Sequence, residues 1–247
     1  RRWVNGVVDG AAPFTGASYD YLRGIGEDGV TRLFGTRYEL ASRGRLGLVA
    51  DFGNVIPPQV RLYSGGVNTV RGVQQNLLGP KFLLVSPERA LELGCELEPG
   101  GCPPGVTVGH DQVGVRPAGG EAVVELNLEG RVWLTRSVQG PAFADYGMLR
   151  RRLGGRGGGL FDSDAWETLI TPGIGLRILS PIGPVRLDLA YDPSGVRQYP
   201  LLTRDPETDD LIFLGPARYA PFTFDDPDGL REFWRRLQFH LAIGQPF

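Results

Sequence analysis

Two cysteines are the side chains in this sequence that could form a covalent link or hold a metal ion. Cys95 and Cys102 lie in one run rich in glycine and proline, a composition that suits a loop. A zinc site would need two further soft ligands close by, and only His110 is near. A disulfide that closes a short loop is the better interpretation and would imply an oxidising compartment. Two free thiols in a cytosolic loop are the alternative.

The other reactive residue types do not form a catalytic set. The chain has 2 histidines, His110 and His240, so neither a cluster of metal ligands nor a Ser-His-Asp arrangement is expected. No pair of nucleophile and base can be named either. The glycine-rich run at residues 154–159 lacks the Gly-Lys-Ser/Thr ending of a phosphate-binding loop, which favours a flexible loop tip. We therefore expect no enzyme activity, no metal and no other cofactor.

The charge balance argues against one class of partner. The 247 residues carry a formal net charge of −2, and both signs are spread along the chain without the basic stripe typical of polyanion-binding proteins. Nucleic acid is therefore not an expected partner. No run approaches the roughly 18 consecutive apolar residues of a membrane-spanning helix. The chain begins Arg1-Arg2-Trp3 without a signal-peptide pattern, so we expect a processed product or a piece of a longer protein.

Apolar and polar residues alternate in several segments, which predicts β-strands. In Pro184–Tyr191 every second residue is apolar and the opposite face is partly charged, and the final segment repeats the pattern with His240 on its polar face. Helical spacing around Phe233 and Trp234 allows a short helix within Asp228–Leu237 instead. We expect about eight strands, one or two of them within Trp3–Ile25 and the others at Thr31–Ala41, Arg45–Gly53, Glu121–Leu134, Gln139–Met148, Pro172–Leu179, Gly183–Asp192 and Arg236–Phe247.

The connections between these strands favour a membrane protein. A soluble β-sandwich also alternates, with its apolar face turned inward, so alternation alone leaves a soluble binding module open. However, some strands are joined by short turns, whereas Leu83–Gly119, Arg150–Thr168 and Ser194–Leu230 are long and polar. Short turns on one side and long loops on the other are typical of bacterial transmembrane barrels.

One loop and four later runs carry a family resemblance. The loop Arg61–Lys81 contains a Gly-Gly pair, then Val70-Arg71-Gly72, then Gly-Pro. The later runs are Gly119-Gly120, the Phe-x-Asp-x-Gly strand Phe143–Gly147, the tight turn Ser180–Pro184 and the final strand Phe239–Phe247. In this order they resemble the outer-membrane protein-assembly family of BamA/TamA type over Arg61 to Phe247. Val73 departs from the aromatic residue that usually follows the Val-Arg-Gly motif.

The resemblance implies a site inside the barrel. In this family the loop folds back into the lumen and its arginine pairs with acids on the inner wall, and Glu129 and Asp145 occupy the matching positions. Such pairing is physically reasonable because a partly buried unpaired charge is costly and arginine forms planar bidentate pairs with carboxylates. A solvated turn residue at Arg71 and ordinary lumen-facing charges at the two acids are the alternatives. The Cys95 and Cys102 pair also falls where BamA proteins carry a loop disulfide.

The resemblance further implies a fold and a location. Residues 1–247 would be the C-terminal part of an antiparallel transmembrane β-barrel in the bacterial outer membrane, about the last eight of sixteen strands. Because an open sheet would expose unpaired edges to lipid, the N-terminal strands and the periplasmic domains would be absent from this chain. An unusually small barrel is the alternative.

The implied function is insertion and assembly of outer-membrane β-barrel proteins. The expected partners are unfolded barrel clients, periplasmic chaperones, accessory lipoproteins and the lipid bilayer. The last strand, with Phe239, Gly244 and Phe247, would pair weakly with the first strand of the barrel and form a seam. A client strand could add to that seam by β-augmentation. Within the same family, TamA-like or two-partner-secretion translocation of proteins is the alternative.

Overall fold

The chain folds into two compact units. The structure is a computed structural model that describes residues 1–12, 16–17, 19–52, 56–150, 166–181, 183–222 and 229–244. The first unit comprises Arg1–Gly79, Gly119–Pro193 and Leu237–Phe247, and the second comprises Pro80–Ala118 and Ser194–Arg236. No helix in the described part of the chain is long and apolar enough to span a bilayer.

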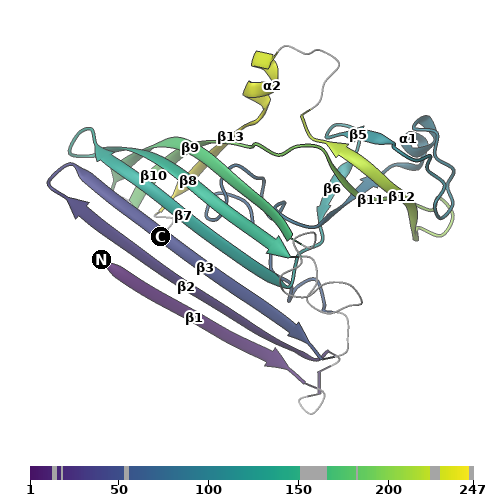
Figure 1. Cartoon of the computed structure of the whole chain (residues 1–247), viewed down its shortest axis with the longest axis horizontal. Coiled ribbons are helices and arrows are strands. Elements are labelled where there is room, and N and C mark those ends of the chain that lie inside the picture. Colours follow the sequence, from purple (N-terminus) through teal and green to yellow (C-terminus); the bar gives the residue numbers. More distant parts are fainter. Residues whose placement is uncertain are drawn as a thin grey trace. The chain divides into compact units, whose positions relative to one another are not determined.

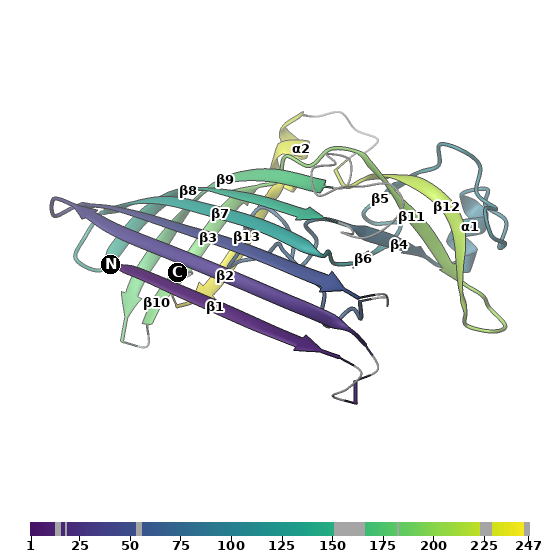
Figure 2. The same cartoon turned by 60° about the horizontal axis from the view of Figure 1, so that its bottom comes forward.

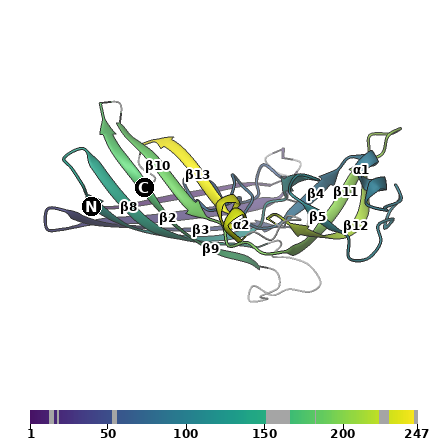
Figure 3. The ribbon, with the colours of Figure 1, turned by 90° about the horizontal axis from the view of Figure 1, so that it is seen from above.

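The first unit is an eight-stranded antiparallel sheet whose strands follow one another in chain order, so every neighbour is also the next strand of this sheet along the sequence (Figures 1 and 2). In Figure 3, β10 and β13 rise away from the plane of β2 and β3, so the sheet is strongly curved. The prediction of about eight antiparallel strands is confirmed. The strands are β1 (Arg2–Ala11), β2 (Tyr21–Phe34), β3 (Tyr38–Asp51), β7 (Ala122–Trp133), β8 (Val138–Arg150), β9 (Trp166–Ser180), β10 (Gly183–Tyr191) and β13 (Leu237–Ile243).

The predicted single strand Thr31–Ala41 is wrong, because a turn divides it. The strand β2 ends at Phe34, β3 begins at Tyr38, and Gly35 between them has a φ of 64°. The turn spans three residues, so even-numbered side chains face outward on both strands: Phe34 is 54% exposed and Tyr38 is 59% exposed. Alternation therefore runs through the turn unbroken, and the periodicity gave no sign of it. The strand expected from Pro172 also begins earlier, at Trp166.

Apolar side chains occupy the exposed face of this sheet, and charged side chains occupy the covered face. On β7, Leu126 and Leu128 are 54% and 52% exposed, whereas Glu125 and Glu129 are fully buried. On β13, Phe239 is 67% exposed. This arrangement is the reverse of a soluble sandwich and matches a transmembrane barrel wall, whose outside is apolar and whose inside is polar. The soluble β-sandwich alternative is therefore wrong.

The second unit is built from two of the expected long connections, Leu83–Gly119 and Ser194–Leu230, which are therefore not structureless. They contribute a five-stranded sheet with the order β5-β12-β11-β4-β6, over a core that includes Leu83, Leu201 and Leu214. Of the two alternatives that the sequence left open within Asp228–Leu237, the short helix is the one present. The elements are β4 (Lys81–Val85), α1 (Pro87–Glu92), β5 (Thr107–Gly109), β6 (Gly114–Pro117), β11 (Arg197–Arg204), β12 (Leu211–Ala220) and α2 (Gly229–Arg235).

The disulfide expected between Cys95 and Cys102 is present in the second unit. It closes a loop after α1, and this loop pairs with β12: the backbone N–H of Gly100 donates to the carbonyl of Phe213, and that of Cys102 donates to the carbonyl of Leu214. Because Cys95 is buried in the core of this unit, the bond fastens the loop to that core. The glycine-rich run at residues 154–159 lies outside the described residues.

Candidate functional site

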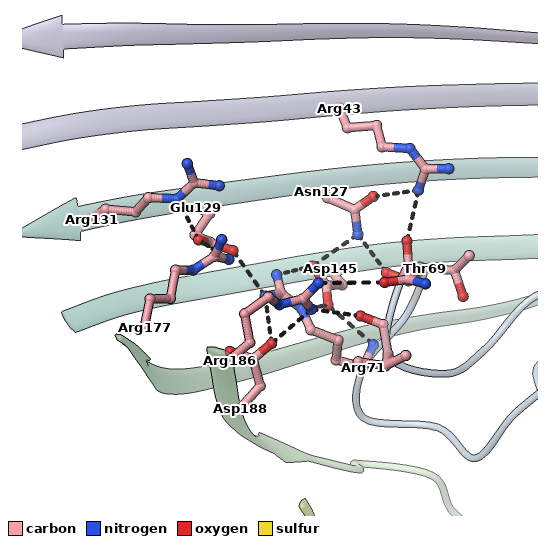
Figure 4. A network of polar contacts seen from close by, with 12 residues as sticks. Arg43, Thr69, Arg71, Asn127, Glu129, Arg131, Asp145, Arg177, Arg186 and Asp188 are labelled. Atoms are coloured by element: carbon pink, nitrogen blue, oxygen red, sulfur yellow. Dashed lines mark hydrogen bonds and ion pairs between the residues drawn. The ribbon is translucent and has the colours of Figure 1, made fainter. Parts of the chain in front are cut away.

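The loop that follows β3 and precedes β4 lies on the covered face of the first unit's sheet. Arg71 near its tip is 2% exposed, and its side chain points towards carboxylates on several neighbouring strands (Figure 4). We call residues 56–79 the lumen loop, because the face that it covers is the polar one. Arg71 thus reaches the face of the sheet on which the alternation of the sequence placed the charged residues.

Asp145 on β8 is the principal partner of Arg71. The guanidinium donates two parallel hydrogen bonds, from Nε to Asp145 Oδ2 at 2.7 Å and from Nη2 to Oδ1 at 2.8 Å. The backbone N–H of Arg71 also donates to Oδ2 at 3.1 Å. The guanidinium carbon lies 3.3 Å from the ring centroid of Phe143, a cation–π contact. Bidentate pairing of this kind fixes the orientation of the guanidinium as well as its charge.

Glu129 on β7 is the second carboxylate of the site, and several arginines share it. Arg71 Nη1 donates to Glu129 Oε2 at 2.9 Å, and Arg131 Nε donates to Oε1 at 2.6 Å. Arg177 on β9 also forms an ion pair with Glu129. Because Glu129 has no exposed side-chain area, its charge depends on these partners rather than on water.

A third carboxylate, Asp188 on β10, was not assigned to this site from the sequence. Its Oδ2 lies 3.5 Å from Arg71 Nη1 and accepts a hydrogen bond from Arg186 Nη2 at 3.0 Å. The alternation of β10 did place Asp188 on the polar face. However, nothing in the local pattern indicated that this face would meet the lumen loop.

The residues on either side of Arg71 explain the rest of the Val-Arg-Gly motif. Val70 is fully buried, and a Cβ on Gly147 of β8 would come within 2.5 Å of its side chain. Gly72 is equally confined: a Cβ there would lie 2.4 Å from the Thr171 side chain and 2.7 Å from the carbonyl oxygen of Tyr191. Val70 therefore packs against β8, and Gly72 allows close approach to β9 and β10.

Side chains of the wall also satisfy the backbone of the lumen loop. Arg43 donates to the carbonyl oxygen of Asn68 at 2.9 Å, and Arg186 donates to that of Val67 at 2.9 Å. Asn127 donates to the carbonyl oxygen of Thr69 at 2.5 Å. Residues 67–69 have no strand pairing in the described chain, so their carbonyls need such donors, because an unpaired buried carbonyl is costly. The wall thus holds the loop by its backbone as well as by Arg71.

His240 on β13 completes the set of contacts. It lies on the polar face, as the alternation predicted, and its Nε2 lies 2.5 Å from the carbonyl oxygen of Arg71. The sequence did not indicate that this histidine would contact the loop. On the same strand Phe239 points outward, and Gly244, just after the strand, has a φ of 108°. Phe247 lies outside the described residues.

These contacts of the lumen loop can brace the wall that the sheet forms. Comparison with known proteins shows the family to which the chain belongs. The sequence profile of the Omp85 superfamily domain matches residues 4–247. No curated protein is matched by the sequence. The fold is similar to the crystal structure of BamA from Haemophilus ducreyi lacking POTRA domains 1–3, with a TM-score of 0.56 and 17% sequence identity.

That match covers 78% of this chain but 35% of the BamA chain, so the present chain spans about a third of its length. At this level of identity the likeness shows a shared barrel fold. The outward apolar face agrees with it, because a bacterial outer-membrane barrel must present such a face to lipid. From the profile match over nearly its whole length, the chain belongs to the Omp85 superfamily and is a bacterial outer-membrane β-barrel protein.

Proposed function

We propose that this chain is part of an insertase that folds β-barrel proteins into the outer membrane, in the manner of a BamA-like central subunit. The observation that carries the proposal is a contrast within one sheet. The lumen loop is fastened to the wall around Asp145, whereas β13 pairs with β10 alone and has no strand on its other side among the described residues. A braced wall beside an available strand edge suits the templating of a new strand.

The edge of β13 supports the proposal because unpaired backbone groups are costly in lipid. The pairing of β13 with β10 covers seven residues, Leu237–Ile243. The opposite edge of β13, like the outer edge of β1, has no strand partner among the described residues. Each unpaired backbone group costs several kcal/mol in the hydrocarbon region. A client strand that pairs with this edge removes that cost for both partners, which is β-augmentation. Gly244, at a positive φ, turns the backbone at the end of the paired segment.

We propose further that residues 1–247 form the C-terminal part of the barrel domain. Two edges of the eight-stranded sheet, at β1 and β13, have no strand partner in the described chain. Closure into a barrel therefore needs additional strands, and the 35% coverage of the BamA chain is consistent with further strands and periplasmic domains in the whole protein. The first of those strands would face β13 across the seam.

The function needs no covalent chemistry. The lumen loop acts as a brace that keeps the curved wall in shape while the seam opens and closes. The partners would be unfolded outer-membrane barrel proteins, the periplasmic chaperones that deliver them, and accessory lipoproteins. Val70, Arg71 and Gly72 with Glu129 and Asp145 would set the stiffness of the wall, and Phe239, Gly244 and Phe247 would shape the seam.

Reconstitution of the full-length protein into liposomes tests the proposal. An unfolded barrel client is added, and its folding is followed by the gel shift of unheated samples. We expect faster folding than with empty liposomes, and disulfide crosslinks from a cysteine at Gln238 of β13 to the client's last strand. A cysteine at Ala144 of β8, in the middle of the sheet, is the matched control. Equal folding rates with and without the protein would rule out the insertase.

The same vesicles separate the alternative in this family, a TamA-like or two-partner-secretion translocator. A translocated substrate crosses the bilayer and becomes resistant to added protease without forming a heat-modifiable barrel. An inserted client instead remains in the membrane fraction and shows the gel shift. The fold is common to both functions, so the fate of the substrate decides between them.

A further inference from the structure

The lumen loop and the last strand of the sheet meet at one hydrogen bond. His240 projects from β13 onto the polar face, and its Nε2 lies 2.5 Å from the backbone carbonyl oxygen of Arg71. A carbonyl oxygen can only accept, so Nε2 carries the proton. The bond joins residues that are 169 positions apart in the sequence, and it uses the backbone of Arg71, whose side chain is engaged elsewhere.

The guanidinium and the backbone carbonyl of Arg71 are held by different strands. The guanidinium is fixed by Asp145 on β8 and Glu129 on β7, strands that have a partner on both sides. The carbonyl oxygen is held by β13, which has one strand neighbour in the described chain. Arg71 therefore connects the well-paired part of the wall with the edge strand.

The register of β13 places His240 beside the same cluster. His240 is directly opposite Asp188 of β10, and Asp188 lies 3.5 Å from Arg71 Nη1. Side chains of β10 and β13 thus converge on Arg71 at one level of the sheet. If β13 separated from β10 at this level, the bond from His240 to the loop would break with the strand pairing.

We propose that His240 is a positioning residue that ties β13 to the lumen loop and thereby limits how readily the edge strand opens. The tie deepens the proposed function, because β13 is the strand that would accept a client, and in that respect it rests on the insertase. Its physical basis is separate: one hydrogen bond that is present while β13 is paired and lost when it opens. A hydrogen bond of ordinary strength corresponds to about a two- to tenfold change in the open population.

Hydrogen exchange on the full-length protein in lipid nanodiscs tests the tie without any client. His240→Leu removes the donor, and His240→Gln keeps an N–H donor at nearly the same distance from the backbone. Gln238→Leu is the matched control, since Gln238 is two residues away on the same face of β13. We expect amide exchange in Leu237–Ile243 to become about two- to tenfold faster in His240→Leu. The rate should remain near that of the native protein in His240→Gln and Gln238→Leu.

Three results would overturn the tie: unchanged exchange in His240→Leu, equal acceleration in His240→Gln, or acceleration spread over β7 and β8 as well as β13. If His240→Leu does not fold, His240→Asn replaces it, because its shorter amide cannot span the same gap and should accelerate β13 alone. The client-folding experiment is run in parallel. Suppose that amide exchange in β13 becomes faster in His240→Leu but the native protein folds no client. The first result would support the tie, and the second would rule out the insertase.

Discussion

Asp145 binds both the side chain and the backbone of Arg71. Its two carboxylate oxygens accept from Nε and Nη2 of the guanidinium and from the backbone N–H of the same residue. Asp145 is fully buried, and Asn127 donates a further hydrogen bond to its Oδ1 at 2.9 Å. One carboxylate on β8 therefore sets the position of the loop tip as well as the direction of its side chain.

Asp145→Asn should destabilise the protein strongly. The change removes the charge that faces Arg71 most closely, and losing one partner of a buried pair typically costs about 3–5 kcal/mol. We expect a loss of this size in the free energy of unfolding, measured by urea titration of the protein in lipid vesicles. Asp209→Asn is the control, because Asp209 forms an exposed pair with Arg204 and should leave stability nearly unchanged. Equal stability of the two variants would contradict the assigned role of Asp145.

Gly72→Ala tests the close approach of the lumen loop to the wall. The added Cβ would lie 2.4 Å from the Thr171 side chain and 2.7 Å from a backbone oxygen, so the loop must move. Overpacking of this kind costs about 1–3 kcal/mol. Gly130→Ala on β7 is the control, because a Cβ there meets nothing within 4 Å. The temperature at which the folded form loses its shifted gel band should fall for Gly72→Ala alone. A matching fall of this temperature in both variants would refute the argument.

Removing the disulfide should weaken the second unit and leave the first intact. Replacing Cys95 and Cys102 by serine frees the loop that pairs with β12, and loss of a native disulfide typically costs about 2–4 kcal/mol. We expect faster proteolysis within Pro80–Ala118, mapped by mass spectrometry, while the first unit keeps its gel shift. Finding both thiols free in native protein isolated from the outer membrane would show that the bond does not form there.

Leu128→Arg tests which face of the sheet contacts lipid. Leu128 lies in the middle of β7 and is 52% exposed, and arginine near the bilayer midplane of a barrel costs about 2–4 kcal/mol. Leu134, at the turn after β7, is 61% exposed, and Leu134→Arg should cost about 0–1 kcal/mol because it lies near the interface. The yield of folded protein in vesicles measures both effects. Identical yields would argue against a lipid-facing position for Leu128.

The sequence by itself determined the faces of the strands. In β7 and β10, alternation assigned Glu129 and Asp188 to the polar face and Leu187 to the other, and the structure agrees. Side chains alternate across any strand whatever its neighbours, so local spacing suffices for this inference. The family resemblance of the motifs also implied Asp145 and Glu129 as partners of Arg71.

Tertiary structure alone decided which of these faces meet. The contacts of Asp188 and His240 with Arg71 join positions 117 and 169 residues apart, and they exist because sheet curvature and the folded-back loop bring the residues together. The sheet of the second unit also depends on tertiary structure, because its strands β4 and β11 pair in parallel although they belong to different connections between strands of the first unit. Local periodicity carries no information about such pairings, since their stability comes from strands that meet only after the chain has folded.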